Sequence, residues 1–163
     1  MTFKLAAVAA VVGALGAGAA PAHALDTVVT GVAGTQLSVG AAAAPAAITL
    51  TKGGANSADS TVVATGLGNW TLRAYESGGD GKMSSAIPAL TLTNPLQIAF
   101  NGGAGFGTFT NLTASAGTGP SFDGTGVQTV PVRYYQPIAD ADMAGLTPGQ
   151  TLTATVTWDL VGR

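Results

Sequence analysis

Acidic side chains are the first candidates for chemistry in this sequence. Asp140 and Asp142 are separated by one residue, and Asp123 lies upstream of them. Such a group could bind calcium or act as an acid–base pair, but known calcium loops supply more oxygen ligands at fixed spacing. Glycosidases need two carboxylates on opposite sides of the substrate, and the only Glu is Glu76. We therefore predict a solvated turn or short helix start at Asp140–Asp142, with calcium binding there left open, and no other metal or catalytic site.

Imidazole and thiol side chains are nearly absent. The 163 residues contain one His, His23, and no Cys. His23 lies in a segment that we expect to be removed, so the working protein has neither group. This excludes Ser-His-Asp and Cys-His catalysis, zinc sites of the usual kind and disulfides. The sequence thus predicts a protein that is not an enzyme and uses no cofactor.

Charge and hydrophobicity exclude further classes of protein. Only 9% of the residues are charged, the formal net charge is −2, and the six Lys and Arg are scattered rather than clustered. A nucleic-acid binder would carry a basic patch. With 47% hydrophobic residues, the chain is also too apolar to be disordered. Its length suits one domain with a real core.

The N-terminal residues 1–24 have the features of a secretory signal peptide. Lys4 supplies a positive charge, Leu5–Ala20 is apolar, and Ala22 and Ala24 form the small-x-small pattern before a cleavage site. A membrane anchor is the rival interpretation, but this apolar run is short for a bilayer, which needs about 20 residues. We predict a secreted chain, processed after Ala24, that has no membrane span and folds as a single domain over 25–163.

The rest of the chain is rich in the β-branched residues Thr and Val, with Gly, Asn, Asp and Pro between the β-prone runs. The clearest strand is Thr151–Leu160, where apolar residues alternate with Thr and Asp. Ala139–Met143 and Met83–Ala89 could each form a helical turn. Short strands separated by turn signals predict an all-β fold, either a single antiparallel β-sandwich of Greek-key-like topology or a barrel. The other strands are expected at Thr27–Val32, Thr35–Val39, Ala46–Lys52, Ser60–Ala64, Asn69–Glu76, Leu90–Thr93, Leu96–Asn101, Thr108–Leu112 and Gln128–Gln136.

Both Trp residues occur in the pattern Trp-x-Leu. Trp70 and Leu72 lie in one predicted strand, and Trp158 and Leu160 end the last one. Because residues two apart share a face of a strand, each pair forms one aromatic–aliphatic surface. That surface could pack in the core, or it could be exposed as an apolar platform that stacks on a ligand.

The two W-x-L motifs, one mid-chain and one near the C-terminus, resemble the WxL domain of bacterial cell-surface proteins. The resemblance includes Gly68–Leu72, the strand ending in Thr157–Leu160 and the predicted signal peptide, and it would extend over roughly 25–163. It implies a non-catalytic protein of the cell surface that attaches non-covalently to the cell wall, through peptidoglycan, and that assembles with other surface proteins. The ligand-binding residues that it implies are Trp70, Leu72, Trp158 and Leu160.

A different class of function also suits this composition. A small, weakly charged, Thr- and Gly-rich β domain could be a self-assembling structural subunit, such as a pilin-like or extracellular-matrix protein. In that case an exposed edge strand would pair with another copy. The candidate strand for exchange is Thr27–Val39.

Overall fold

The computed structural model describes residues 37–40, 47–77 and 79–163, which belong to one compact unit, Gln36–Arg163. The predicted signal peptide 1–24 and the predicted strand Thr27–Val32 lie outside the described residues. None of the helices in the described ranges is long and apolar enough to cross a membrane. The elements are β1 (Leu37–Val39), β2 (Ser57–Tyr75), β3 (Ser84–Ala86), β4 (Ala89–Thr91), β5 (Gln97–Phe100), β6 (Thr110–Asn111), β7 (Ser121–Tyr135), α1 (Asp140–Met143) and β8 (Thr157–Gly162).

The fold is all-β and its described strand pairs are antiparallel, which confirms the predicted fold class. The main sheet has the order β1-β2-β7-β5-β6, with β8 also paired to β2, and β3 and β4 form a separate hairpin. The architecture is sandwich-like, and the described strands do not close into a barrel. β2 and β7 are the longest strands, and every other strand of the main sheet except β6 pairs with one of them.

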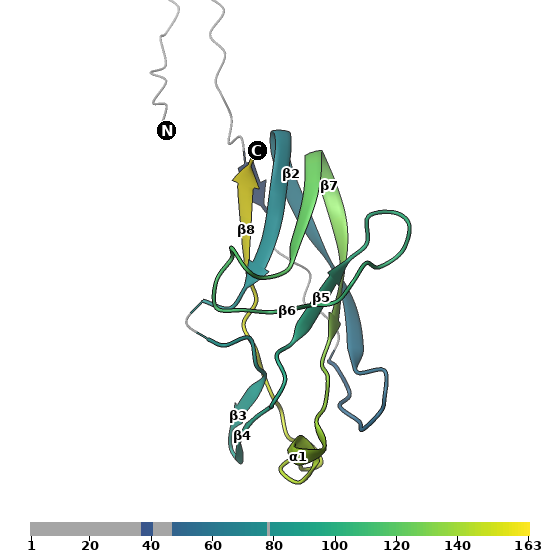
Figure 1. Ribbon diagram of the computed structural model, residues 1–163, viewed down its shortest axis with the longest axis vertical. Helices are drawn as coiled ribbons and strands as arrows, with labels where there is room; N and C mark the ends of the chain where they lie inside the picture. Colours follow the sequence, from purple (N-terminus) through teal and green to yellow (C-terminus); the bar gives the residue numbers. More distant parts are fainter. Residues whose placement is uncertain (1–36, 41–46, 78) are drawn as a thin grey trace, which may run out of the picture. The chain divides into compact units, whose positions relative to one another are not determined.

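The long β2–β7 ribbon bends at one level along its length (Figure 1). The β2–β7 register shifts between Thr65 and Asn69, where β2 carries Gly66 and Gly68. On the facing strand, Gly126 has a φ of 65°, a backbone conformation that other residues rarely adopt. A bulge and an adjacent left-handed glycine bend a strand and increase its twist. The ribbon therefore folds over itself, so that its two halves can enclose a core.

Core residues from both halves of the ribbon belong to one cluster. Val62 in the first half of β2 and Val132 in the second half of β7 are buried together with Leu72 beyond the bend. Aromatic rings also connect different strands around this cluster. The ring centroid of Phe100 of β5 lies 5.6 Å from that of Phe122 of β7 and 6.1 Å from that of Trp158 of β8. Alternating burial along the strands produces this cluster, as the period-2 pattern predicts.

Two predicted strands, Ser60–Ala64 and Asn69–Glu76, prove to be parts of one strand of 19 residues. Gly66 and Gly68 between them lie at the register shift, and Gly126 of β7 faces the same level, so the ribbon bends there without a break in the strand. The predicted helical turn at Ala139–Met143 is confirmed as α1, whereas Met83–Ala89 contains β3 and the turn of a hairpin instead.

The last predicted strand is shorter than expected. Only Thr157–Gly162 forms β8, and the residues before it are extended without a partner strand. The reason is that β2, the partner of β8, ends at Tyr75. The backbone N–H of Thr155 donates instead to the Glu76 side chain, at 3.0 Å, and Thr153 forms an isolated bridge with Ser84. The predicted strand Ala46–Lys52 does not form either, because none of its described residues, 47–52, is in a strand.

Candidate functional site

The fold brings the two W-x-L motifs together on neighbouring strands. Leu72 of β2 faces Leu160 of β8 across the ladder, and Trp158 faces Ala74. Cross-strand partners point to the same side of a sheet, so all four motif residues share the face that packs against the core. The sequence places these residues far apart, and pairing between them was not predicted.

Trp70 and Leu72 are core residues. Both are 0% exposed, and the indole Nε1 of Trp70 donates a hydrogen bond to the Gly126 carbonyl oxygen at 2.9 Å. A Cβ built on Gly66 or on Gly124 would lie under 3.0 Å from the indole ring. Because a ring enclosed in this way has no free face, the predicted exposed platform does not exist at Trp70 and Leu72. Their burial corrects the ligand-contact role that the family resemblance implied for them.

Trp158 and Leu160 are half-buried and pack against the edge of the same core. Rings connect the two motifs, because Trp70 lies 6.2 Å from Phe122, which lies next to Phe100, which in turn contacts Trp158. Aromatic pairs at such separations add to the stability that burial alone provides. Of the two Trp residues, only Trp158 is therefore placed to contact both the core and a ligand.

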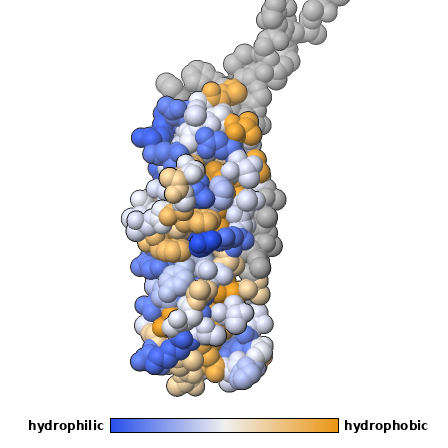
Figure 2. Space-filling view, turned by 90° about the vertical axis from the view of Figure 1, so that its right-hand side faces the viewer, coloured by the Kyte–Doolittle hydropathy of each residue, from blue (hydrophilic) through white to orange (hydrophobic). Residues whose placement is uncertain are grey.

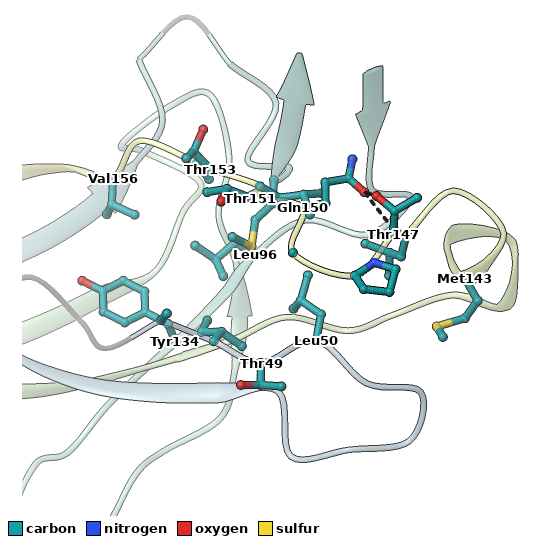
Figure 3. A pocket seen from close by; sticks show the side chains of 18 of the residues that line it. Thr49, Leu50, Leu96, Tyr134, Met143, Thr147, Gln150, Thr151, Thr153 and Val156 are labelled. Carbon is teal, nitrogen blue, oxygen red and sulfur yellow. Dashed lines mark hydrogen bonds between the residues drawn. The ribbon is translucent and has the colours of Figure 1, made fainter. Parts of the chain in front are cut away.

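A pocket of about 1010 Å³ opens beside Trp158. Figure 3 shows extended residues of two segments, Thr49–Leu50 and Thr151–Thr153, around it, with Leu96 and Tyr134 between them. Pockets of this volume are at the upper end of the range for small-ligand sites. The lining consists of Ala47, Ile48, Thr49, Leu50, Met83, Leu96, Tyr134, Met143, Leu146, Thr147, Pro148, Gly149, Gln150, Thr151, Leu152, Thr153, Ala154, Val156 and Trp158.

The pocket lining carries no charged side chain. Its one titratable group is the Tyr134 hydroxyl, and burial raises the pKa of that phenol to about 12, which keeps it neutral. Polar contacts come from Thr side chains and from Gln150, whose Oε1 accepts a hydrogen bond from the Thr147 N–H at 3.1 Å (Figure 3). An uncharged, mainly apolar lining suits neutral or apolar ligand groups, since an unpaired ionic group would lose its hydration there.

Most of the pocket was missed at the level of sequence, where only Trp158 was singled out. Alternating apolar residues in the Ala46–Lys52 and Thr151–Leu160 runs did signal one buried face for each. What the sequence did not reveal is that residues of both segments line one pocket, together with Leu96 and Tyr134.

The acidic residues do not form a shared site. A carboxylate oxygen of Asp140 lies 2.9 Å from the ammonium nitrogen of Lys52. Asp123 instead forms an ion pair with Arg163, in which a carboxylate oxygen lies 2.7 Å from a guanidinium nitrogen. Asp142 is 3% exposed and uses both carboxylate oxygens within the fold. Within the described ranges, no three His, Cys, Asp or Glu residues are grouped so that they could hold a metal ion. The structure therefore gives Asp142 a structural role.

That role is to fix α1 against the loop after β4. Oδ1 of Asp142 accepts hydrogen bonds from the backbone N–H and the hydroxyl of Thr93, at 2.9 and 2.7 Å, and Oδ2 accepts one from the Ala139 N–H at 2.9 Å. Burial by itself raises the pKa of this carboxyl, but the hydrogen bonds outweigh burial and hold the pKa below its ordinary value.

Replacement of this carboxylate should make the stability of the protein less dependent on acid pH. Because the pKa is lowered on folding, Asp142 stabilises the fold above the ordinary pKa of about 4, and this contribution disappears as the pH falls through the folded-state value. We expect Asp142→Asn to lower the free energy of unfolding by about 1–3 kcal/mol at neutral pH. Urea titrations of both proteins between pH 7 and pH 2 should show the difference shrinking below pH 4, and a difference independent of pH would contradict this role.

No protein-family model, curated protein or solved structure matches this chain. The pocket beside the paired W-x-L strands is the site to which the geometry of the described residues leads.

Proposed function

We propose that the protein is a secreted, non-catalytic surface protein that attaches non-covalently to the cell wall through its WxL-like β domain, with peptidoglycan as the polymer bound. The predicted signal peptide and the two W-x-L motifs support this assignment. Its main support in the structure is the uncharged pocket beside Trp158, the motif Trp that remains partly exposed.

Trp158 is the residue that we assign to ligand contact. An indole ring stacks well on the apolar face of a sugar ring, and the pocket beside it offers apolar side chains together with hydroxyl and amide groups. Small-molecule sites typically have this composition, with a few polar groups that fix the orientation of the ligand. Trp70, Leu72 and Leu160 support the strand pair that holds Trp158 in place.

The lining also favours binding over catalysis. It contains no carboxylate, imidazole, thiol or amine that could transfer a proton or attack a substrate near neutral pH. Glu76, the only Glu, accepts backbone hydrogen bonds from Gly81 at 2.8 Å and Thr155 at 3.0 Å. These hydrogen bonds give the Glu76 carboxylate a structural role.

Co-sedimentation with purified peptidoglycan tests the proposal. We expect the wild-type protein to pellet with the polymer and Trp158→Ala to bind at least about tenfold more weakly, because Trp residues at the centre of a contact typically contribute about 2 kcal/mol or more. Thr151→Glu, which adds a charge at an exposed lining position, should weaken binding as well.

Thr110→Glu is the matched control, since Thr110 is exposed on β6 and does not line the pocket. Near-ultraviolet circular dichroism of each variant verifies that the fold is retained, with the buried Trp70 as an internal reporter. Retained fold with unchanged binding in Trp158→Ala and Thr151→Glu would remove the pocket from the proposal, and a wild-type protein that ignores purified wall would refute the attachment itself.

The alternative function, self-assembly through an exchanged strand Thr27–Val39, is altered by the fold. Leu37, Ser38 and Val39 already pair with Gly66, Thr65 and Ala64 in the sheet, and the remainder of that segment lies outside the described residues.

A further inference from the structure

Two runs of extended backbone border the pocket beside Trp158. The lining includes every residue of 48–50 and every residue of 151–154 (Figure 3). Successive side chains of an extended chain point to opposite faces, so a cavity that contacts each residue of such a run lies against its backbone edge. The pocket is therefore bordered by backbone groups of both runs as well as by side chains.

Most backbone groups of these two edges have no hydrogen-bond partner within the described part of the chain. Thr153 bonds to Ser84 in both directions, at 2.8 and 2.9 Å, but the N–H and C=O groups of residues 48–50, 151, 152 and 154 form no hydrogen bond with another described residue. Each of these residues carries one backbone donor and one backbone acceptor. The two edges thus offer a ligand hydrogen-bonding groups that are all uncharged.

The charged residues that adjoin the lining in the sequence are engaged elsewhere. Lys52, two residues beyond the first run, forms an ion pair with Asp140 at 2.9 Å, and Asp142 uses both carboxylate oxygens on Thr93 and Ala139. Figure 2 shows hydrophilic residues at the top, middle and bottom of one flank of the described part, so the uncharged lining is a local property of the pocket. A charged ligand group would lose its hydration there without gaining an opposite charge.

The two parts of peptidoglycan differ in charge. Its stem peptides carry free carboxylate and amino groups, whereas its glycan strand is a chain of N-acetylated sugars that is uncharged where the lactyl groups are linked to peptide. Such a sugar presents hydroxyl and amide groups to neutral donors and acceptors, and an apolar ring face and a methyl group to apolar surface. Trp158, Leu50 and Leu152 supply apolar surface in the lining, next to the two backbone edges.

We propose that the pocket binds the glycan strand of the wall polymer, between the two backbone edges and against Trp158, and that it rejects the stem peptides. This inference rests on the function proposed above, because it names the part of the polymer that the same pocket takes. The backbone groups bond the hydroxyl and acetamido groups, and so fix the orientation of a ligand that is otherwise held by apolar contact.

Isothermal titration calorimetry with soluble oligomers gives the first test. We expect chitohexaose, a hexamer of N-acetylglucosamine, to bind the purified protein, and Trp158→Ala to bind it at least about tenfold more weakly. Cellohexaose, which has the same linkage without acetamido groups, should also bind at least about tenfold more weakly, because the hydrogen bonds of those groups are lost. A stem pentapeptide should neither bind nor displace chitohexaose. No binding of chitohexaose, equal affinity for both sugars, or displacement by the peptide would overturn the proposal.

A pair of opposite charges at one lining position gives the second test. Thr151 is exposed on the lining, so both Thr151→Glu and Thr151→Lys should fold and place a charge beside the ligand. For an uncharged ligand, we expect both variants to bind peptidoglycan at least about threefold more weakly. Thr110→Glu and Thr110→Lys, outside the pocket, are the matched controls and should bind like the wild type. Opposite effects of the two signs at Thr151 would show that a charged part of the polymer is bound, which would overturn the proposal.

Co-sedimentation separates this inference from the function on which it rests. A protein that pellets with peptidoglycan but does not bind chitohexaose would retain wall attachment and overturn the assignment of the glycan strand. A protein that binds chitohexaose but does not pellet with peptidoglycan would refute wall attachment and support the preference of the pocket for N-acetylated sugars.

Discussion

Trp70→Ala should destabilise the protein severely, by about 3–5 kcal/mol. The side chain is 0% exposed, and its removal empties the centre of the core, between the two halves of the bent ribbon. The variant also leaves the Gly126 carbonyl without its indole donor. Because small domains are stable by only about 5–15 kcal/mol, the loss should lower the melting temperature by on the order of 10–20 °C.

Thermal unfolding followed by far-ultraviolet circular dichroism measures this effect. Trp158→Ala is the informative comparison, because Trp158 is half-buried at the edge of the same core and should cost less stability. The two W-x-L motifs would then separate by role, Trp70 in folding and Trp158 in binding. If Trp70→Ala melted like the wild type and instead lost binding to peptidoglycan, the core assignment of Trp70 would be wrong.

The fold class could be predicted because burial alternates along the strands. Gln128–Gln136 was predicted as a strand, and its alternate residues Val130, Val132 and Tyr134 are all buried in the core. This signal depends only on the period of the strand and on side-chain hydrophobicity. It says nothing about which strand lies beside which, so the pairing of β8 with the second half of β2 could not be deduced.

The bend of the ribbon could not be predicted from the sequence, for a related reason. Gly66 and Gly68 lie between the two predicted strands Ser60–Ala64 and Asn69–Glu76, and glycines at such a place indicate either a turn or a bulge. Whether the chain turns or bends depends on the facing strand, which here has glycines at the same level. The pairing of β2 with β7 therefore determines that the ribbon bends, and the same pairing buries Trp70 against Gly124.

The candidate site was predictable only in part. The W-x-L pattern drew attention to Trp158, which lines the pocket. It could not distinguish a partly exposed indole from a buried one, since both motifs alternate in the same way. The two indoles differ in burial because of their places in the sheet. Trp70 lies on a strand that is paired on both sides, with Gly124 of β7 as one cross-strand partner and Gly162 of β8 as the other. Trp158 lies near the start of β8, where the pairing with β2 ends.

Gly124→Ala should destabilise the protein by about 1–3 kcal/mol, although alanine normally improves on glycine in a strand. Gly124 is the cross-strand partner of Trp70, and a Cβ at this position would lie under 3.0 Å from three atoms of the six-membered indole ring. The ring cannot move aside cheaply, because it is fully buried and its Nε1 is bonded to Gly126. Gly68→Ala is the matched control, since it lies in the same bend with free space around its Cβ, and it should be neutral or slightly stabilising.

A double-mutant cycle isolates the contact between the glycine and the ring. Trp70→Phe keeps an aromatic ring in the core but shortens the side chain, so that the atoms closest to position 124 are gone. In that background Gly124→Ala should cost at least about 1 kcal/mol less than in the wild type, as expected for residues in direct contact. Denaturant unfolding of the four proteins gives the coupling energy. Strictly additive losses would mean that Gly124 is required for the backbone of the bend, and that the space for the indole is not what makes glycine necessary there.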